Sequence, residues 1–185
     1  ENNEGKGQEA PLQRVQKSKD KPTEKSKNIA IEPEKYTVTF VADNQTVARR
    51  KLFDWSKEED KQIRYYSGTA IYKTTFSWKN KQQKGQEVYL HLGTVYNLAT
   101  VYVNGIDCGT VWTAPYRANI TAALKKGTNE LKIEVTNTWA NALKGADEGK
   151  APFEGIWTNA KYRKQEDTLL PAGLLGPLWL EQNNK

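Results

Sequence analysis

The stretch VYVNGIDCGTVW, residues 101–112, decides the fold, because it carries a strand-type alternation that is interrupted by Asn104-Gly105. Asn-Gly is a favoured pair for a two-residue hairpin turn: both central residues need a positive φ, which Gly adopts freely and Asn tolerates. Before the turn, one face carries Ala99, Val101 and Val103, and the other carries Thr100, Tyr102 and Asn104. The stretch therefore predicts a β-hairpin with one buried and one solvated face, and Gly109 allows its second strand to resume.

Strand signals continue on both sides of this hairpin, and long helical periodicity is missing. Alternating or apolar runs predict strands at residues 36–40, 68–78, 87–92, 131–135 and 173–182. The capping-box pattern from Ser56 to Glu59 predicts a short helix over residues 57–62, and residues 121–127 predict one helical turn closed by a glycine. Many short strands with turns between them indicate an all-β sandwich with one or two short helical turns.

Composition favours one domain with a polar tail. The chain has 185 residues, a hydrophobic content of 37% and a mean hydropathy of -0.83. Residues 1–28 are highly charged and poor in apolar side chains, so we interpret them as a tail or linker, and residues 29–185 as the sandwich. The chain starts at Glu1 rather than Met, which is what removal of an upstream segment such as a signal peptide would leave. No stretch approaches the ~20 apolar residues of a membrane span, and we expect none.

Charge and cysteine content exclude several functions. The net charge of +6 is spread along the chain without a zinc-finger spacing, a phosphate-binding glycine loop or an RNA-binding aromatic motif, so we expect no nucleic-acid partner. Cys108 is the single cysteine, which rules out an intramolecular disulfide.

His91 is the single histidine and alternates away from Leu90 and Leu92, which predicts a surface or inter-sheet role. No cluster of metal-ligating side chains is present, and no metal ligands are assigned.

Three segments together resemble a known family: LFDWSKEEDKQIRYYSGTAIYKTTF, VYLHLGTVYNLATVYVNGIDCGTVWTAPYRANITAALKKGTNELKIEVTNTWANALKG and LLPAGLLGPLWL. In this order they are similar to the C-terminal β-sandwich of glycoside hydrolase family 106, which contains α-L-rhamnosidases. The middle segment also resembles the sugar-binding domain of family 2 hydrolases, a galactose-binding-like jelly roll. Nothing in the sequence corresponds to the barrel that carries catalysis in these enzymes.

The resemblance therefore implies a jelly-roll accessory module that binds glycan weakly or braces a catalytic domain, in cis or in trans. It also implies carbohydrate as a partner and export to the periplasm or cell surface. A structural calcium ion held by backbone carbonyls occurs in galactose-binding-like folds, but such a site leaves no side-chain signature. We expect no other cofactor.

Sugar binding needs flat aromatic rings for the apolar faces of pyranoses and polar side chains for their hydroxyl groups. Candidate residues for such a platform come from three loops: Trp112, Tyr116, Arg117, Trp139, Asn141 and Trp157. The alternative interpretation is that these aromatic residues fill a core or an interdomain seam. Three further tryptophans, in strand-like or capped contexts, are predicted to lie in the core: Trp55, Trp78 and Trp179.

Two other functions remain open. A small glycosidase would need two facing carboxylates, and it would use Glu148 or Glu154 in the aromatic loop; we assign no catalytic residue. A protein-interaction sandwich would use residues 137–168 as its docking surface, because this connection is too long for a passive link.

Overall fold

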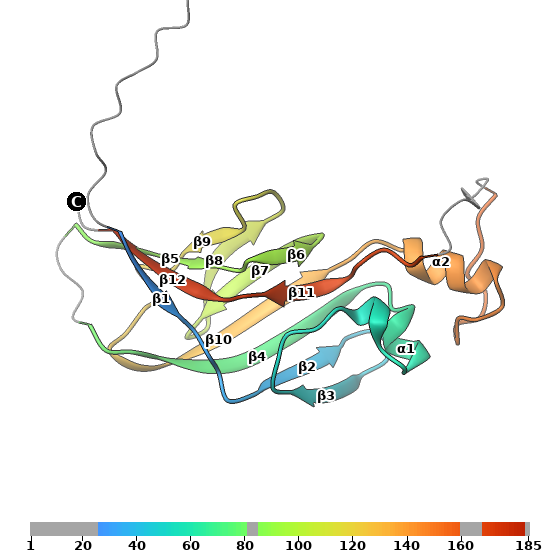
Figure 1. The fold of residues 1–185 in the computed structure, drawn as a ribbon, viewed down its shortest axis with the longest axis horizontal. Helices are drawn as coiled ribbons and strands as arrows, with labels where there is room; N and C mark the ends of the chain where they lie inside the picture. The colour runs from blue at the N-terminus through green and yellow to red at the C-terminus, as the bar shows by residue number, and fades with distance from the viewer. Residues whose placement is uncertain (1–25, 81–84, 160–167, 184–185) are drawn as a thin grey trace, which may run out of the picture.

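The computed structural model describes residues 26–80, 85–159 and 168–183 of the chain. Its strands form a sandwich of two antiparallel sheets with a two-stranded sheet beside them (Figure 1), which confirms the all-β prediction. The six-stranded sheet runs in the order β3 (Gln45–Arg49), β2 (Tyr36–Phe40), β4 (Thr69–Trp78), β10 (Gly127–Thr136), β7 (Leu98–Val103), β8 (Ile106–Val111). The four-stranded sheet runs in the order β1 (Lys27–Ala30), β12 (Trp179–Asn183), β5 (Glu87–His91), β9 (Arg117–Asn119). The small sheet pairs β11 (Gly173–Gly176) with β6 (Thr94–Tyr96).

Alternate side chains of both large sheets build one continuous core. Val38 and Phe40 of β2 are fully buried, as are Val88 and Leu90 of β5 in the opposite sheet, and all four belong to one apolar cluster. Burying a side chain of this size contributes about 1.5–3 kcal/mol. The core thus follows directly from the period-two pattern of the sequence.

The Asn104-Gly105 turn has the predicted geometry, with φ values of 52° and 80°. A register shift between β7 and β8 places Gly109 in a bulge with a φ of 100°, where the Asp107 carboxylate accepts a hydrogen bond from its N–H. Asn104 also has a tertiary role: its amide nitrogen donates to the side chain of the fully buried Asn129 at 2.8 Å. This contact fixes the hairpin to the start of β10.

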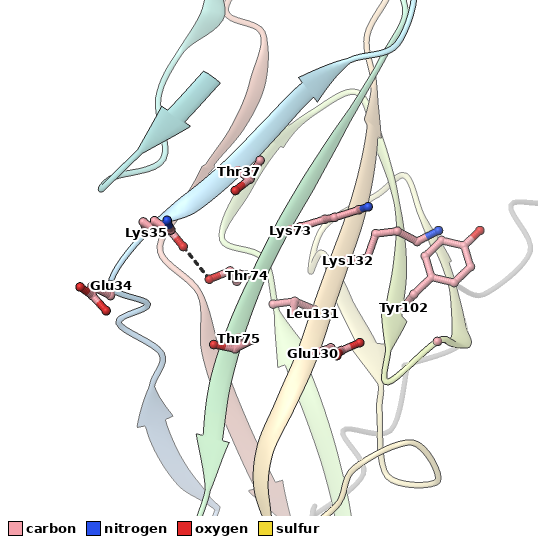
Figure 2. Close-up of a pocket in the computed structure, with 11 residues that line it drawn as sticks. Glu34, Lys35, Thr37, Lys73, Thr74, Thr75, Tyr102, Glu130, Leu131 and Lys132 are labelled. Atoms are coloured by element: carbon pink, nitrogen blue, oxygen red, sulfur yellow. Dashed lines mark hydrogen bonds between the residues drawn. The ribbon is translucent and has the colours of Figure 1, made fainter. Parts of the chain in front are cut away.

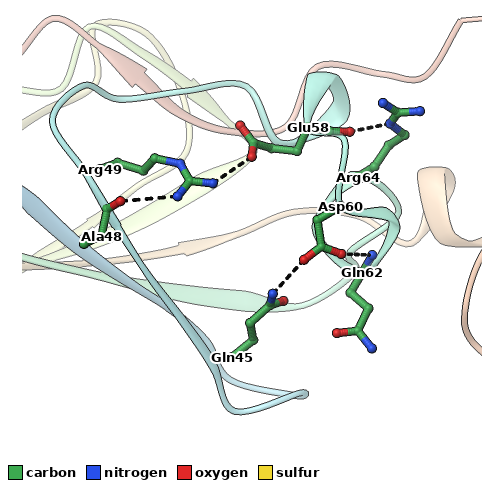
Figure 3. Close-up of polar contacts among 7 residues, drawn as sticks. All are labelled: Gln45, Ala48, Arg49, Glu58, Asp60, Gln62 and Arg64. Atoms are coloured by element: carbon green, nitrogen blue, oxygen red, sulfur yellow. Dashed lines mark hydrogen bonds and ion pairs between the residues drawn. The ribbon is translucent and has the colours of Figure 1, made fainter.

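The segment between β3 and β4 holds two short helices, and the capping-box prediction there is wrong. The 3-10 helix η1 (Trp55–Lys57) is capped by the Asp54 carboxylate, and α1 (Lys61–Arg64) by the Asp60 carboxylate. Figure 3 shows how polar contacts tie these helices to β3: Arg49 pairs with Glu58 at 2.8 Å, and Gln45 donates to Asp60 at 2.7 Å. Aspartate therefore supplies both caps, since its short side chain reaches the exposed N–H groups of the first turn.

Two of the three tryptophans predicted for the core are buried there. Trp55 is fully buried and packs edge-to-face against Phe40, with ring centroids 5.3 Å apart, and Trp78 is 2% exposed. The prediction for Trp179 is wrong. Its indole lies on the outer face of the four-stranded sheet, half-buried and stacked on the His91 ring at 3.6 Å. Pro177 lies between β11 and β12.

Three other predictions need correction in detail. Residues 173–182 form the two strands β11 and β12, which pair with different partners, rather than one strand. Residues 121–123 form turns rather than a helix, although Leu124 donates to the Ile120 carbonyl as a single helical turn would. The long connection after β10 contains an unpredicted helix, α2 (Ala140–Asp147), which lies beyond the end of the sheets (Figure 1).

The first described strand overlaps the predicted tail. β1 begins at Lys27 and pairs with β12, so the last two residues of the predicted tail, Lys27 and Asn28, belong to the sandwich. Residues 1–25 lie outside the described part of the chain. Within that part, no helix combines the length and the apolar character that spanning a membrane requires.

Candidate functional site

The connection between β8 and β9 and the first residue of β9 hold three of the predicted residues, in different environments. Trp112 follows β8 directly and is 68% exposed. Tyr116 is half-buried against the core, and its carbonyl accepts a hydrogen bond from the Leu92 N–H at 2.8 Å. Arg117 begins β9 and points outward. The connection therefore presents one free indole on a base that is anchored to the core.

The two remaining tryptophans flank α2. Trp139 occupies the N-cap position of this helix and is 72% exposed, and Trp157 lies in the segment after the helix and is 79% exposed. Both indoles keep most of their apolar surface in contact with solvent. Aromatic side chains of this size dominate the energetics of interfaces when they are buried.

Asn141 lies inside the structure rather than on an open surface. Its side chain is buried in α2, where its amide nitrogen donates to the Leu170 carbonyl at 2.7 Å and its oxygen accepts from the Leu170 N–H at 2.8 Å. A side-chain amide that pairs with both the N–H and the carbonyl of one residue holds two segments of the backbone together. Asn141 holds the start of α2 against the segment that leads into β11.

The predicted residues do not converge on one place. In Figure 1 the loop between β8 and β9 stands over the sandwich, whereas α2 lies beyond the end of the sheets. The Trp112 connection and the residues around α2 are therefore separate surfaces. We call them the tryptophan surfaces: the first carries Trp112, and the second comprises Trp139 and Trp157, which precede and follow α2 in the chain.

Arg117 belongs to a cluster that sequence reasoning did not assemble. On the outer face of the four-stranded sheet, the Glu181 carboxylate pairs with Arg117 at 3.2 Å and with His91 Nε2 at 2.7 Å. The Arg117 guanidinium also lies over the Tyr89 ring, 4.6 Å from its centroid. The hydrogen bond with His91 is the main cause of a lowered pKa at Glu181.

Alternation in the sequence placed His91 on this outer face, and that prediction is confirmed. The pairing with β12 could not be seen in the sequence, since Glu181 lies ninety residues further along the chain. The Glu181 carboxylate compensates the charge of Arg117 in this cluster. The Arg117 side chain, although 40% exposed, therefore attracts an anionic ligand less strongly than an unpaired arginine would.

The carboxylates proposed for a glycosidase have ordinary surroundings. Glu148 forms ion pairs with Lys150 at 2.8 Å and Lys144 at 3.5 Å, and the hydrogen bond from Lys150 lowers its pKa. A general acid in glycoside hydrolysis needs the opposite shift. Glu154 is exposed in the segment after α2. Over the described ranges, no group of three or more His, Cys, Asp or Glu side chains is arranged to hold a metal ion.

Known proteins share this architecture. Residues 22–168 match the family described as "Glycosyl hydrolase 2 galactose-binding domain-like". A rhamnosidase from Novosphingobium sp. PP1Y superimposes with a TM-score of 0.78 at 36% identity, over 86% of this chain and 15% of that chain. A beta-D-glucuronidase from Dictyoglomus thermophilum superimposes with a TM-score of 0.59 at 19% identity, over 89% of this chain and 29% of that chain, which shows the shared fold.

A curated relative agrees with this picture. The protein named "Putative beta-glucuronidase" from Formosa agariphila is 34% identical over 170 residues, which cover 77% of this chain and 15% of the relative. The chain thus corresponds to about one seventh of this relative and of the rhamnosidase, as expected for one domain of a larger architecture. The predicted resemblance to a galactose-binding-like domain of glycoside hydrolases is confirmed, and the chain belongs to the glycosyl hydrolase 2 galactose-binding domain-like family.

Proposed function

We propose that this chain is an accessory domain that braces the catalytic domain of a glycoside hydrolase, in cis or in trans, through its tryptophan surfaces. The observation that carries this proposal is the exposure of three indoles, at 68%, 72% and 79%. The short span of the chain relative to its rhamnosidase and glucuronidase-named relatives supports it.

The spacing of the indoles favours docking over a single sugar platform. A sugar ring needs aromatic and polar groups within one small site, whereas a stable protein interface covers ~800 Å² on each partner. Each tryptophan can bury roughly 150–250 Å². Two separate surfaces that present such anchors fit a broad interface, in which a few tryptophans supply most of the affinity.

The test is association with a catalytic domain encoded in the same gene or in a neighbouring gene, followed by calorimetry. Trp112→Ala, Trp139→Ala and Trp157→Ala are each expected to weaken binding about tenfold or more, because each removes an anchor of the interface. Val41→Ala and Ile106→Ala are matched controls, since these side chains are 51% and 50% exposed elsewhere, and they should bind normally. Equal losses in the controls, or tight binding by the triple tryptophan variant, would overturn the proposal.

A second function, weak glycan binding, is favoured by the environment of Trp112. This exposed indole stands in the same connection as Tyr116, and Arg117 begins the next strand with 40% of its side chain exposed. A glycan array with rhamnose-, galactose- and uronate-containing saccharides tests it. Binding in the millimolar to micromolar range should disappear in Trp112→Ala while the melting temperature stays unchanged. An array without any bound saccharide leaves bracing as the only role.

We further propose that the domain acts in the periplasm or at the cell surface, as the family resemblance implies. Cell fractionation of the native organism tests this location. Recovery of the protein solely in the cytoplasmic fraction would contradict it.

A further inference from the structure

The outer face of the six-stranded sheet carries a depression of about 570 Å³ (Figure 2), and none of the three exposed tryptophans lines it. Its volume falls within the ~300–1,000 Å³ that small-molecule sites usually occupy. Four neighbouring strands form its floor, so side chains are held on paired backbone rather than on loops. Such a floor positions ligand-binding groups well.

One row of side chains crosses the depression in register. Thr37 of β2 is the partner of Lys73 of β4, which is the partner of Lys132 of β10, which is the partner of Tyr102 of β7. Figure 2 shows the Lys73 and Lys132 side chains extending in the same direction from neighbouring strands, with the Lys132 ammonium next to the Tyr102 ring. The next row adds Thr75 and Glu130, which are also partners.

Two lysines directly opposite each other on paired strands carry an electrostatic cost. Lys132 is compensated, because its ammonium lies 2.9 Å from the Glu134 carboxylate and 3.7 Å from the centroid of the Tyr102 ring. Lys73 is exposed and makes no ion pair with any residue of the described ranges. An exposed ammonium without an ion pair in these ranges is available to pair with an anionic group of a ligand.

The other lining groups restrict the chemistry of that ligand. Thr37, Thr75 and the Tyr102 hydroxyl donate and accept hydrogen bonds. The exposed carboxylates of Glu34 and Glu130 only accept them, and Lys35 adds a further exposed cation. A carboxylate repels a ligand that is anionic throughout, such as inorganic phosphate or a nucleic acid. It accepts hydrogen bonds from the hydroxyls of a ligand whose negative charge is confined to another position.

We propose that this depression is a binding site for an anionic saccharide, in which Lys73 pairs with the oxyanion and the threonines, Tyr102 and Glu130 bind sugar hydroxyls. Carboxylated and sulfated sugars share the required chemistry. The site does not depend on bracing of a catalytic domain, since it uses neither tryptophan surface.

The experiment is calorimetric titration of the chain with three oligosaccharides of equal length: galacturonate, galactose 6-sulfate and neutral galactose oligomers. We expect binding of one or both anionic oligomers, weakened by added salt, and at least about tenfold weaker binding of the neutral oligomer. The two anionic arms distinguish a carboxylate ligand from a sulfate ligand. Equal affinity for charged and neutral oligomers, or binding of none of them, would overturn the proposal.

Variants locate the site on the sheet. Lys73→Gln should weaken binding of the anionic oligomer about tenfold, and Lys73→Arg should restore most of it. Lys79→Gln is the matched control: it removes the same charge from an exposed residue just after β4, outside the depression, and should bind normally. Lys73→Gln should also leave the melting temperature unchanged or raise it, because it removes a like-charge pair. Equal losses in Lys73→Gln and Lys79→Gln, or a loss in Trp112→Ala instead, would refute the assignment.

Discussion

At the scale of single residues, replacing a side chain is most costly where its polar atoms are buried and hydrogen-bonded. The Tyr72 hydroxyl lies in the core, where it accepts hydrogen bonds from Trp55 Nε1 at 2.7 Å and from the Leu174 N–H at 3.3 Å. Burial raises the pKa of this hydroxyl, so it stays protonated across the physiological range. Its inward position follows the alternation of buried and less buried side chains in β4. Its partners are 17 and 102 residues away and belong to the tertiary structure.

Tyr72→Phe tests this link. The change leaves two buried N–H donors without an acceptor, so we expect it to lower the free energy of unfolding by about 1–3 kcal/mol. Denaturant titration followed by tryptophan fluorescence measures the loss. Tyr89→Phe on the outer face is the control and should change stability by less than about 0.5 kcal/mol. A Tyr72→Phe protein as stable as the parent would mean that the two donors find other acceptors.

At the scale of elements, the segment before β11 docks on η1 and leaves no room for a side chain at Gly173. The Trp55 backbone N–H donates to the Ala172 carbonyl at 3.0 Å, and the Ala172 N–H donates to the Asp54 carboxylate at 3.0 Å. Gly173 follows with a φ of 99°, and a Cβ there would collide with the Trp55 indole. The close approach of the strand to a buried ring explains why this position holds glycine.

Gly173→Ala should therefore destabilise the domain by clearly more than the roughly 1–2 kcal/mol that a positive φ costs a non-glycine residue. Gly155→Ala separates the two causes, because Gly155 has a φ of 74° but no neighbouring atoms within 4 Å of the position that an added methyl group would take. Thermal unfolding of both variants measures the difference. Equal melting temperatures would show that the indole moves aside and that only the backbone strain matters.

At the scale of the whole molecule, the tyrosines of the shared core link its stability to alkaline pH. Burial raises the pKa of Tyr36 to about 12 and also raises the pKa of Tyr66 and Tyr72. The folded state thus holds these protons more tightly than the unfolded state, in which tyrosine ionises near pH 10. Unfolding therefore releases protons above that pH. Each further rise in pH then lowers the free energy of unfolding.

We therefore expect full stability from these groups below pH 10 and a progressive loss as the pH rises from about 10 to 12. Melting curves recorded across this range measure the effect. Tyr36→Phe removes one contribution and should make the decline shallower. A melting temperature that stays constant up to pH 12 would contradict burial of these hydroxyls.

The parts of the structure that depend on interactions between residues close in sequence could be predicted. The hairpin at residues 101–112 and the faces of β2, β5 and β10 depend on period-two alternation and on the φ preferences of Asn and Gly, which are local properties. The helix caps at Asp54 and Asp60 are also local features, but the nearby Ser56–Glu59 pattern was interpreted as the cap instead. Helix α2 escaped prediction because its anchor, the Asn141 contact with Leu170, joins segments 29 residues apart.

The candidate sites show the same division. The sequence by itself determined an all-β sandwich, its apolar layer and the choice of family, since these need only residue order and local geometry. Only the tertiary structure decided that Trp179 stacks on His91, that Asn141 is buried, and that the exposed indoles occupy two surfaces. It alone aligned Lys73 with Lys132, because the register between strands depends on packing of the whole sheet, which no single stretch of sequence contains.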